Sequence, residues 1–275
     1  MSKLQLIGFV GAGQMAQALA GGIAASDPGV SFLVADPSQA AIDSFDQRTG
    51  DSKVDAVAEN SEVFARADAV FLAVKPQYFV AALDTDAIKA AIADRSQPPL
   101  VVSVMAGIDM AHIQHRTTID TVIRVMPNTP CLVGAGACGM ASSEEVSAEH
   151  QQAVSDFLAT TGIVVPVAEE LLDAVTGLSG SGPAYVFELI DALALGGVKS
   201  GLPRDVADKL AKQTVFGSAK LAIESGEHPS VLRDRVTSPG GTTIAGLKAL
   251  FDNGYQQAII AAVEAATERS KELGS

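Results

Sequence analysis

The chain has 275 residues, of which 48% are hydrophobic and 19% charged, and its formal net charge is -13. This apolar content is enough to bury a core, so the composition excludes wholesale disorder. An acidic chain with no basic run lacks the attraction for phosphates on which nucleic-acid binding depends, so we expect no nucleic-acid partner. The two cysteines are too few for a disulfide framework and lack a zinc-binding spacing. We therefore expect them to be inert packing residues and predict no metal site.

The N-terminal sequence runs directly into an alternating apolar segment at residues 4–10. It lacks the separate apolar stretch and the small-residue cleavage site of a signal peptide. No apolar run reaches the length of about 18 residues that suggests a membrane span. We therefore expect a cytoplasmic protein with no membrane partner.

The first part of the chain alternates short β-branched runs with alanine-rich helical stretches. This pattern is typical of βαβ units on a parallel sheet. Ser142 and Glu145, three residues apart, predict a capping box for a helix that continues to about residue 160. The expected strands cover residues 4–10, 31–35, 54–57, 69–74, 100–104, 121–125, 137–141 and 163–167.

From residue 169 onward the strand-like runs disappear, and apolar residues recur with helical spacing. Pro183 and Pro203 predict the starts of two long helices, because proline suits the first helical turn. We predict an α/β Rossmann-type domain over residues 1–166 and an all-α domain over residues 167–275. The apolar stripes of the second domain are too many for one exposed layer, so they favour dimerisation. The expected helices cover residues 183–198, 203–225, 229–236, 243–251 and 255–273.

A glycine-rich turn follows the first expected strand and opens the first helix, as a dinucleotide-binding fingerprint requires. Gly11 permits the tight turn, Gly13 lets the backbone approach a pyrophosphate, and the small Ala16 allows close packing of the helix on the strand. The helix N-terminus then faces the phosphate charge. In the alternative interpretation, the glycines only allow the tight turn to form and bind no ligand. The place of the turn at the start of a βαβ array favours nucleotide binding.

The end of the second expected strand carries residues that can choose between NADH and NADPH. Asp36 lies about 20 residues past the fingerprint. There its carboxylate can accept hydrogen bonds from the ribose hydroxyls and repel a 2′-phosphate. Ser38 can instead donate to that phosphate, with Arg48 or Lys53 as helpers. Asp36 and Ser38 are also typical turn and helix-cap residues, so these interpretations stay open.

Five further segments have an unusual density of small and polar residues. Three of them follow expected strands, where open parallel sheets place their ligands: residues 72–77, 103–108 and 124–130. Two lie in the helical part, with the sequences GLSGSGPAY at residues 177–185 and VTSPGGTTIAGL at residues 236–247. Together with residues 8–16, these segments resemble the pyrroline-5-carboxylate reductase family over essentially the whole chain.

This resemblance implies the last step of proline biosynthesis, the reduction of 1-pyrroline-5-carboxylate to L-proline with NADPH or NADH. It also implies that the helical domain intertwines with a second subunit, that the dimer shares the substrate site, and that dimers join into rings. It places cofactor contacts on Gly11, Ala12, Gln14, Met15, Asn60, Ala73, Val74, Lys75, Met105 and Ala106, to which we add Gly13, Asp36, Ser38 and Pro76. The expected substrate contacts are Glu169, Ser238, Gly240, Gly241, Thr242 and Thr243.

Reduction of a C=N bond does not require a strong acid from the protein. An imine is far more basic than a carbonyl and can bind as an iminium, so the protein has to position the ring and orient its nitrogen. Thr243 is the candidate catalytic residue, because its hydroxyl can orient that nitrogen; a helix N-cap is its alternative role. Gly240 and Gly241 before it let the backbone approach and hold the substrate carboxylate in a nest of amides.

Two other functions stay open. Lys199 lies on a long helix after the expected Rossmann domain, which suits a β-hydroxyacid dehydrogenase, although Pro203 stands where that family has asparagine. The second alternative is a catalytically silent NAD(P)-binding protein. Other proton donors are poor candidates, because no tyrosine is followed four residues later by lysine and the four histidines lie in polar surroundings.

Overall fold

The computed structural model describes residues 4–274, which divide into two compact units. Unit 1 comprises the chain up to Gly180 and again from Ala265, and unit 2 comprises Ser181–Glu264. We predicted a domain boundary after residue 166, and the compact division comes later. The reason is that Leu172 is buried in the core of unit 1 and that the hydroxyl of Ser270 donates to Asp173 at 2.6 Å.

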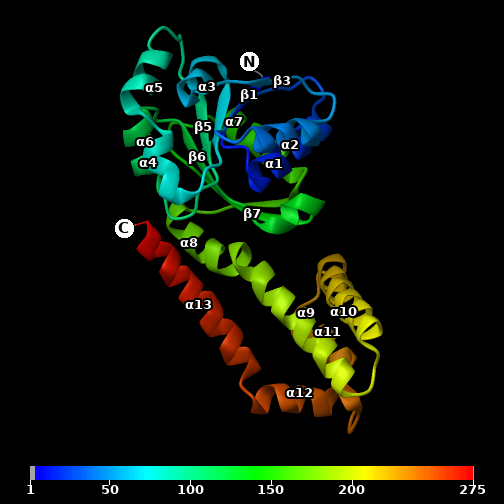
Figure 1. Ribbon diagram of the computed structural model, residues 1–275. Coiled ribbons are helices and arrows are strands. Elements are labelled where there is room, and N and C mark those ends of the chain that lie inside the picture. Colours follow the sequence, from blue (N-terminus) through cyan, green and yellow to red (C-terminus); the bar gives the residue numbers. More distant parts are fainter. Residues whose placement is uncertain (1–3, 275) are drawn as a thin grey trace. The chain divides into compact units, whose positions relative to one another are not determined.

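Unit 1 is built on one sheet (Figure 1). Its strand order is β3-β2-β1-β4-β5-β6-β7-β8. Each predicted strand is present within two residues of its expected bounds. The strands are β1 (Leu6–Val10), β2 (Ser31–Ala35), β3 (Val54–Ala56), β4 (Ala69–Leu72), β5 (Leu100–Ser103), β6 (Val122–Met126), β7 (Gly136–Ser142) and β8 (Gly162–Pro166).

Strand direction changes at one end of the sheet. β1 to β6 are parallel, as the βαβ pattern predicts. β7 runs antiparallel to β6, and β8 is parallel to β7. The expectation of a parallel sheet is wrong for β7 and β8, because residues 127–135 are too short a link for a helical crossover between β6 and β7.

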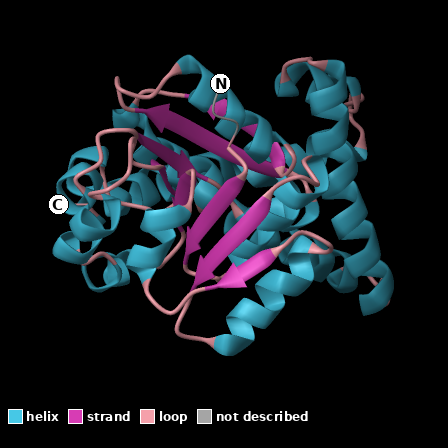
Figure 2. Ribbon diagram, turned by 90° about the horizontal axis from the view of Figure 1, so that it is seen from above, coloured by secondary structure: helices cyan, strands magenta, loops and turns pink. Residues whose placement is uncertain are grey.

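Helices cover both faces of this sheet (Figure 2). On one face, Phe9, Phe32 and Phe71 of the strands pack with Phe45 of α2 in an aromatic cluster. On the other face, Val70 and other strand residues pack against helices α3, α5 and α6. The helices of unit 1 are α1 (Gln14–Ser26), α2 (Gln39–Thr49), α3 (Asn60–Arg66), α4 (Phe79–Ala82), α5 (Thr85–Ile92), α6 (Met110–Thr117), α7 (Ala148–Ala159) and α8 (Leu172–Val175).

Helix α7 begins later than predicted. Ser142 is the last residue of β7, and the hydroxyl of Ser143 accepts the amide at the start of β6. The helix is capped by Ser147, whose hydroxyl accepts the His150 amide at 3.2 Å. The capping box of Ser142 and Glu145 is therefore wrong, since tertiary contacts hold this segment in the strand and a turn.

Unit 2 is helical, as predicted, and it has almost no core of its own. Its helices are α9 (Gly182–Lys199), α10 (Arg204–Ser225), α11 (Pro229–Arg235), α12 (Thr242–Asp252) and α13 (Tyr255–Leu273), the last of which ends in unit 1. A π-helical turn, Thr176–Gly180, precedes α9. Among the described residues of unit 2, the buried hydrophobic side chains are Ala194, Ala207 and Ala211.

Large apolar side chains of unit 2 are exposed on every one of its helices. They include Val186, Phe187, Leu193, Leu195, Val206, Leu210, Phe216, Leu221, Ile223, Val231, Ile244, Leu250, Phe251, Ile259 and Ile260. A surface of this kind marks a protein–protein interface. Within residues 4–274, no helix is both long and apolar enough to cross a bilayer.

Candidate cofactor and substrate sites

The turn between β1 and α1 has the geometry of a dinucleotide phosphate site. Gly11 has φ +98°, a conformation that favours glycine, and a Cβ there would lie 2.9 Å from the carbonyl carbon of Ala73. Gly13 is the N-cap of α1 without a capping side chain, and nothing lies within 4 Å of the place its Cβ would take. The first amides of α1 therefore face open space in which a phosphate fits.

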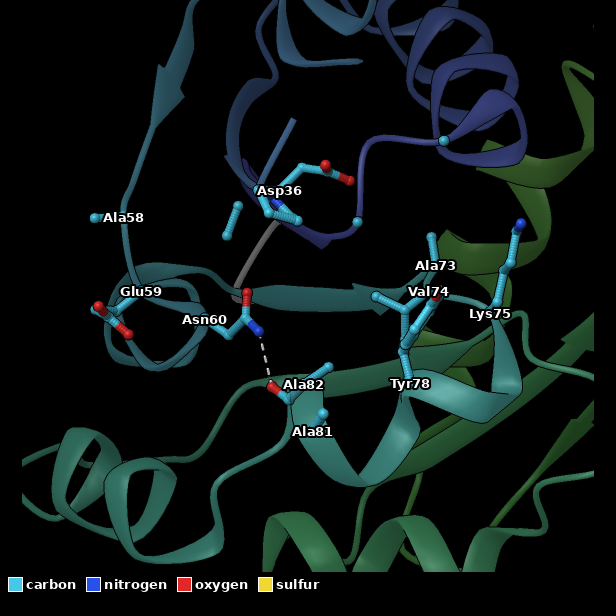
Figure 3. Close-up of a pocket in the computed structure, with 14 residues that line it drawn as sticks. Asp36, Ala58, Glu59, Asn60, Ala73, Val74, Lys75, Tyr78, Ala81 and Ala82 are labelled. Carbon is cyan, nitrogen blue, oxygen red and sulfur yellow. Dashed lines mark hydrogen bonds between the residues drawn. The ribbon is translucent and has the colours of Figure 1, made fainter. Parts of the chain in front are cut away.

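A pocket of about 550 Å³ lies beside this turn (Figure 3). It is at the carboxyl ends of β1 and β4, where the strand order reverses, as expected for ligands of open α/β sheets. Its volume suits a small-molecule or cofactor site. The wall is formed by Gly11, Gly13, Ala35, Asp36, Pro37, Ala58, Glu59, Asn60, Ala73, Val74, Lys75, Tyr78, Ala81 and Ala82.

Asp36 lies in this wall, and its carboxylate also holds the fingerprint turn. Oδ2 accepts the Ala12 amide at 2.7 Å, and Oδ1 accepts the Ser38 amide at 2.8 Å. Each oxygen keeps a lone pair that can accept a ribose hydroxyl. Ser38 lies outside the pocket wall and caps α2, since its hydroxyl accepts the Ala41 amide at 3.3 Å. The cap role suggested for Ser38 is thus the one that the structure shows.

Lys75 supplies the positive charge of the pocket wall. Its side chain is exposed, follows β4 and belongs to the pocket, so its ammonium can reach a phosphate. Arg48 was the alternative helper, but its guanidinium donates to Leu132 O at 3.0 Å and lines a separate hollow. Lys53, the other helper considered, is not part of the pocket wall.

Asn60 lies at the start of α3, in another part of the pocket wall (Figure 3). Its Nδ2 donates to Ala82 O at 2.8 Å, which fixes the side chain and leaves Oδ1 as an acceptor. This arrangement suits recognition of the adenosine part of a dinucleotide.

Some predicted cofactor residues are not part of the pocket wall. Met105 and Ala106 follow β5, where Met105 is 3% exposed and its amide donates to Ser103 Oγ at 3.3 Å. The other predicted residues outside the wall are Ala12, Gln14, Met15, Ser38 and Pro76. Wall residues that the sequence analysis missed are Ala35, Pro37, Ala58, Glu59, Tyr78, Ala81 and Ala82. The ends of β2, β3 and β4 are the signal that could have found most of them.

The predicted substrate loop precedes α12 in unit 2. The Gly241 amide donates to Ser238 O at 3.1 Å, which closes a turn in which Gly240 has φ +67°. Pro239 and Gly240 suit the two central positions of a type II turn. A Cβ on Gly241 would lie 2.2 Å from Ser238 Oγ, so a larger residue there would displace the Ser238 hydroxyl.

Helix α12 begins directly after this turn and presents its first amides uncapped. Gly241 is the N-cap and has no capping side chain, which leaves the amides of Thr242, Thr243 and Ile244 as donors for an anion. Thr243 is the second residue of the helix. The alternative role of Thr243 as N-cap is therefore wrong, and its half-buried hydroxyl does not cap the helix.

Glu169, the remaining predicted substrate contact, lies in unit 1 and is held by other residues of that unit. Its Oε1 accepts Arg124 Nη1 and the Met110 amide, each at 2.7 Å. The Arg124 side chain is only 10% exposed, so this ion pair satisfies a buried cation. The structure thus shows Glu169 in an ion pair within unit 1, and its substrate contact stays a prediction. Ser238, Gly240, Gly241, Thr242 and Thr243 lie in the turn and at the start of α12.

The other candidate proton donors, the lysine and histidines considered above, do not cluster into a catalytic group. Lys199 is the exposed last residue of α9. His112 pairs with Asp109 at 2.7 Å on the surface, and His228 caps α11. Within residues 4–274, no group of three or more His, Cys, Asp or Glu side chains is arranged to hold a metal ion.

Comparisons with known proteins agree over the full length of the chain. Residues 169–273 match the family described as pyrroline-5-carboxylate reductase dimerisation, and residues 6–107 match the family described as NADP oxidoreductase, coenzyme F420-dependent. The chain is 43% identical to pyrroline-5-carboxylate reductase of Synechocystis, with 98% of each chain covered. It is 41% identical to the reductase of Arabidopsis thaliana, with 97% of this chain and 95% of that one covered.

A solved structure confirms the fold. The crystal structure of Plasmodium falciparum pyrroline carboxylate reductase, with NADP bound, has a TM-score of 0.84 and 32% identity, and all of both chains is covered. The predicted Rossmann domain, the helical dimerisation domain and the nicotinamide cofactor are thereby confirmed. The chain therefore belongs to the pyrroline-5-carboxylate reductase family of NAD(P)H-dependent oxidoreductases.

Proposed function

We infer that this protein reduces 1-pyrroline-5-carboxylate to L-proline and that Ser238, Gly240, Gly241, Thr242 and Thr243 bind the substrate. The observation that carries the site assignment is the uncapped start of α12 behind a glycine turn. The chain is strongly acidic, yet it has to hold an anionic substrate. Backbone amides at a helix N-terminus provide that attraction without a cationic side chain.

The reaction needs a hydride donor, a positioned imine and a proton on the ring nitrogen. NAD(P)H supplies the hydride when it is bound. The first amides of α12 fix the substrate carboxylate. The hydroxyl of Thr243, the second residue of this helix, orients the ring nitrogen of the iminium. Such positioning lowers the barrier by several kcal/mol, on the order of 7 to 11 in the best intramolecular cases.

On the cofactor side, the uncapped amides of α1 hold the pyrophosphate and Lys75 adds positive charge. Asp36 and Asn60 recognise the adenosine part. The proposed cofactor set keeps Ala73 and Val74, which line the pocket, and also Ala12, Gln14, Met15, Met105 and Ala106, which lie outside its wall.

The dimer, rather than the single chain, carries the complete site in this proposal, because unit 2 leaves its apolar helices uncovered. Self-association of the helical domain fits its family. We further propose that dimers join into a ring and that the enzyme works in the cytoplasm, the usual compartment of proteins whose cysteines are free thiols. Sedimentation and localisation of the tagged protein test these two points.

The decisive experiment follows NAD(P)H consumption with 1-pyrroline-5-carboxylate at neutral pH for the wild type, Thr243→Val and Lys199→Ala. Thr243→Val keeps the shape and deletes one hydroxyl, so kcat and kcat/KM should fall together by roughly tenfold for about 1.4 kcal/mol. NAD(P)H affinity should be unchanged, and so should the activity of Lys199→Ala.

A matched control is Thr237→Val, which removes a hydroxyl bonded to Arg233 O outside the proposed site. It should retain wild-type kinetics. Wild-type turnover by Thr243→Val together with an inactive Lys199→Ala would reject the hydroxyl mechanism and favour a hydroxyacid dehydrogenase.

A further inference from the structure

The two cysteines of the chain face one another in the interior of unit 1. Cys131 lies in the 3-10 turn Thr129–Val133 after β6, and Cys138 lies on β7. Their Sγ atoms are 3.8 Å apart, and the residues are 4% and 1% exposed. The sequence analysis expected inert packing residues, but the structure brings the two thiols into contact.

Cys131, although buried, also forms part of the wall of a hollow. It lines a hollow of about 300 Å³ together with Arg48, Thr160 and Thr161. Arg48 is exposed, and its guanidinium is fixed by the bond to Leu132 O. A small anionic molecule is therefore attracted to the hollow that Cys131 lines.

The two thiols differ in character. The hydrogen bond between the two thiols lowers the pKa of Cys131 although burial opposes this. The same hydrogen bond, together with burial, raises the pKa of Cys138. Cys131 is thus the better thiolate and lines the hollow, while Cys138 lies behind it.

We propose that Cys131 and Cys138 are a reversible thiol–disulfide site for small anionic disulfides that enter the hollow beside Arg48. The Cys131 thiolate attacks one sulfur of the disulfide RSSR, which forms a mixed disulfide and releases RS⁻. Cys138 then loses its proton and attacks the Cys131 sulfur, which forms the internal disulfide and releases the second RS⁻. Two protein thiols are oxidised and one small disulfide is reduced to two thiols.

The test incubates the reduced full-length protein with oxidised glutathione and follows its mass under non-reducing conditions. We expect the wild type to lose two hydrogens and both titratable thiols, and dithiothreitol to restore them. Cys138→Ser should stop at a mixed disulfide and gain one glutathionyl group. Cys131→Ser should gain none, because the remaining thiol does not line the hollow and has a raised pKa.

Arg48→Gln tests the recognition step separately. It should slow the reaction with anionic glutathione disulfide several-fold and leave the reaction with the cationic disulfide cystamine unchanged. Circular dichroism confirms that each variant is folded. The proposal is overturned if folded wild type keeps both thiols at full glutathione oxidation, or if Cys131→Ser reacts as fast as Cys138→Ser.

Discussion

The two compact units differ in how they bury their apolar residues. In unit 1, both faces of the sheet are covered by helices of the same chain, and side chains such as Phe9 and Phe71 are fully buried. In unit 2, three alanines make up the buried core, while Phe187 and Phe216 are 64% and 60% exposed. Unit 1 therefore has a core within one chain, whereas unit 2 leaves its apolar helices exposed, as suits a dimerisation domain.

This difference separates the two tasks of the enzyme. The cofactor pocket belongs to the self-sufficient unit, so nucleotide binding should tolerate changes in association. The proposed substrate loop belongs to the unit that needs a partner, so substrate reduction should not tolerate them. Oligomer state and cofactor affinity can then be varied independently.

The largest effect should come from a charge placed on the exposed apolar surface of α9. Phe187→Asp removes the burial of one phenylalanine from each subunit, about 3–6 kcal/mol for the pair, which weakens the dimer by a hundredfold or more at about 1.4 kcal/mol per tenfold. Sedimentation should show monomers at micromolar concentration with proline formation lost. NADPH binding, measured by fluorescence, should remain.

The control is Val133→Asp, which adds the same charge to a side chain that is 79% exposed in unit 1. This variant should remain associated and active. A fully active Phe187→Asp monomer would contradict the conclusion that unit 2 depends on a second copy.

A second test removes cofactor binding and leaves association intact. Gly11→Ala places a side chain at φ +98° and 2.9 Å from the backbone of Ala73, so the Kd for NADPH should rise tenfold or more, about 1.4 kcal/mol. Gly50→Ala is matched, because Gly50 also has a positive φ of 63° but has nothing within 4 Å of its Cβ position. It should lower Tm slightly and leave the Kd unchanged. Equal effects of the two variants would remove Gly11 from the cofactor site.

Sequence patterns predicted the position of the strands and of the long helices, because strong periodicity and proline at the helix starts are local signals. The reversal at β7 depends on the length of the link after β6, and the pattern of β-branched residues does not contain that information. The start of α7 at Ser147 was missed because the hydroxyl of Ser143 bonds to the neighbouring strand instead. The π-helical turn before α9 has no sequence signature of its own.

At the sites, residues at strand ends and glycine turns could be predicted, while contacts between distant segments could not. Gly11, Asp36 and Lys75 were expected in the cofactor pocket and lie in its wall. Glu169 was expected at the substrate, but its pairing with Arg124 across 45 positions of the chain is visible only in the structure.

A third test addresses the substrate loop of the partner-dependent unit. Gly241→Ala brings a Cβ to 2.2 Å from Ser238 Oγ and displaces it, which crowds the amides proposed to hold the carboxylate. KM for pyrroline-5-carboxylate should rise roughly tenfold with a smaller change in kcat, as expected when ground-state binding is lost. Gly217→Ala on α10, where a Cβ meets nothing within 4 Å, is the control and should keep the wild-type KM. An increase in KM for NADPH alone would contradict the assignment.

The smallest effect concerns the choice of cofactor in the self-sufficient unit. Asp36 places a carboxylate in the pocket wall, where it repels a 2′-phosphate, and it also holds the amides of Ala12 and Ser38. Asp36→Ser should improve use of NADPH relative to NADH by about fivefold, or about 1 kcal/mol, while the loosened turn lowers both specificity constants. Asp36→Asn separates the two roles, because it removes the charge and keeps a side-chain acceptor for one amide; it should shift the ratio with a smaller loss in either constant. If both variants leave the ratio of the two kcat/KM values at the wild-type level, Asp36 serves the turn alone, and the choice between NADH and NADPH is made elsewhere in the pocket.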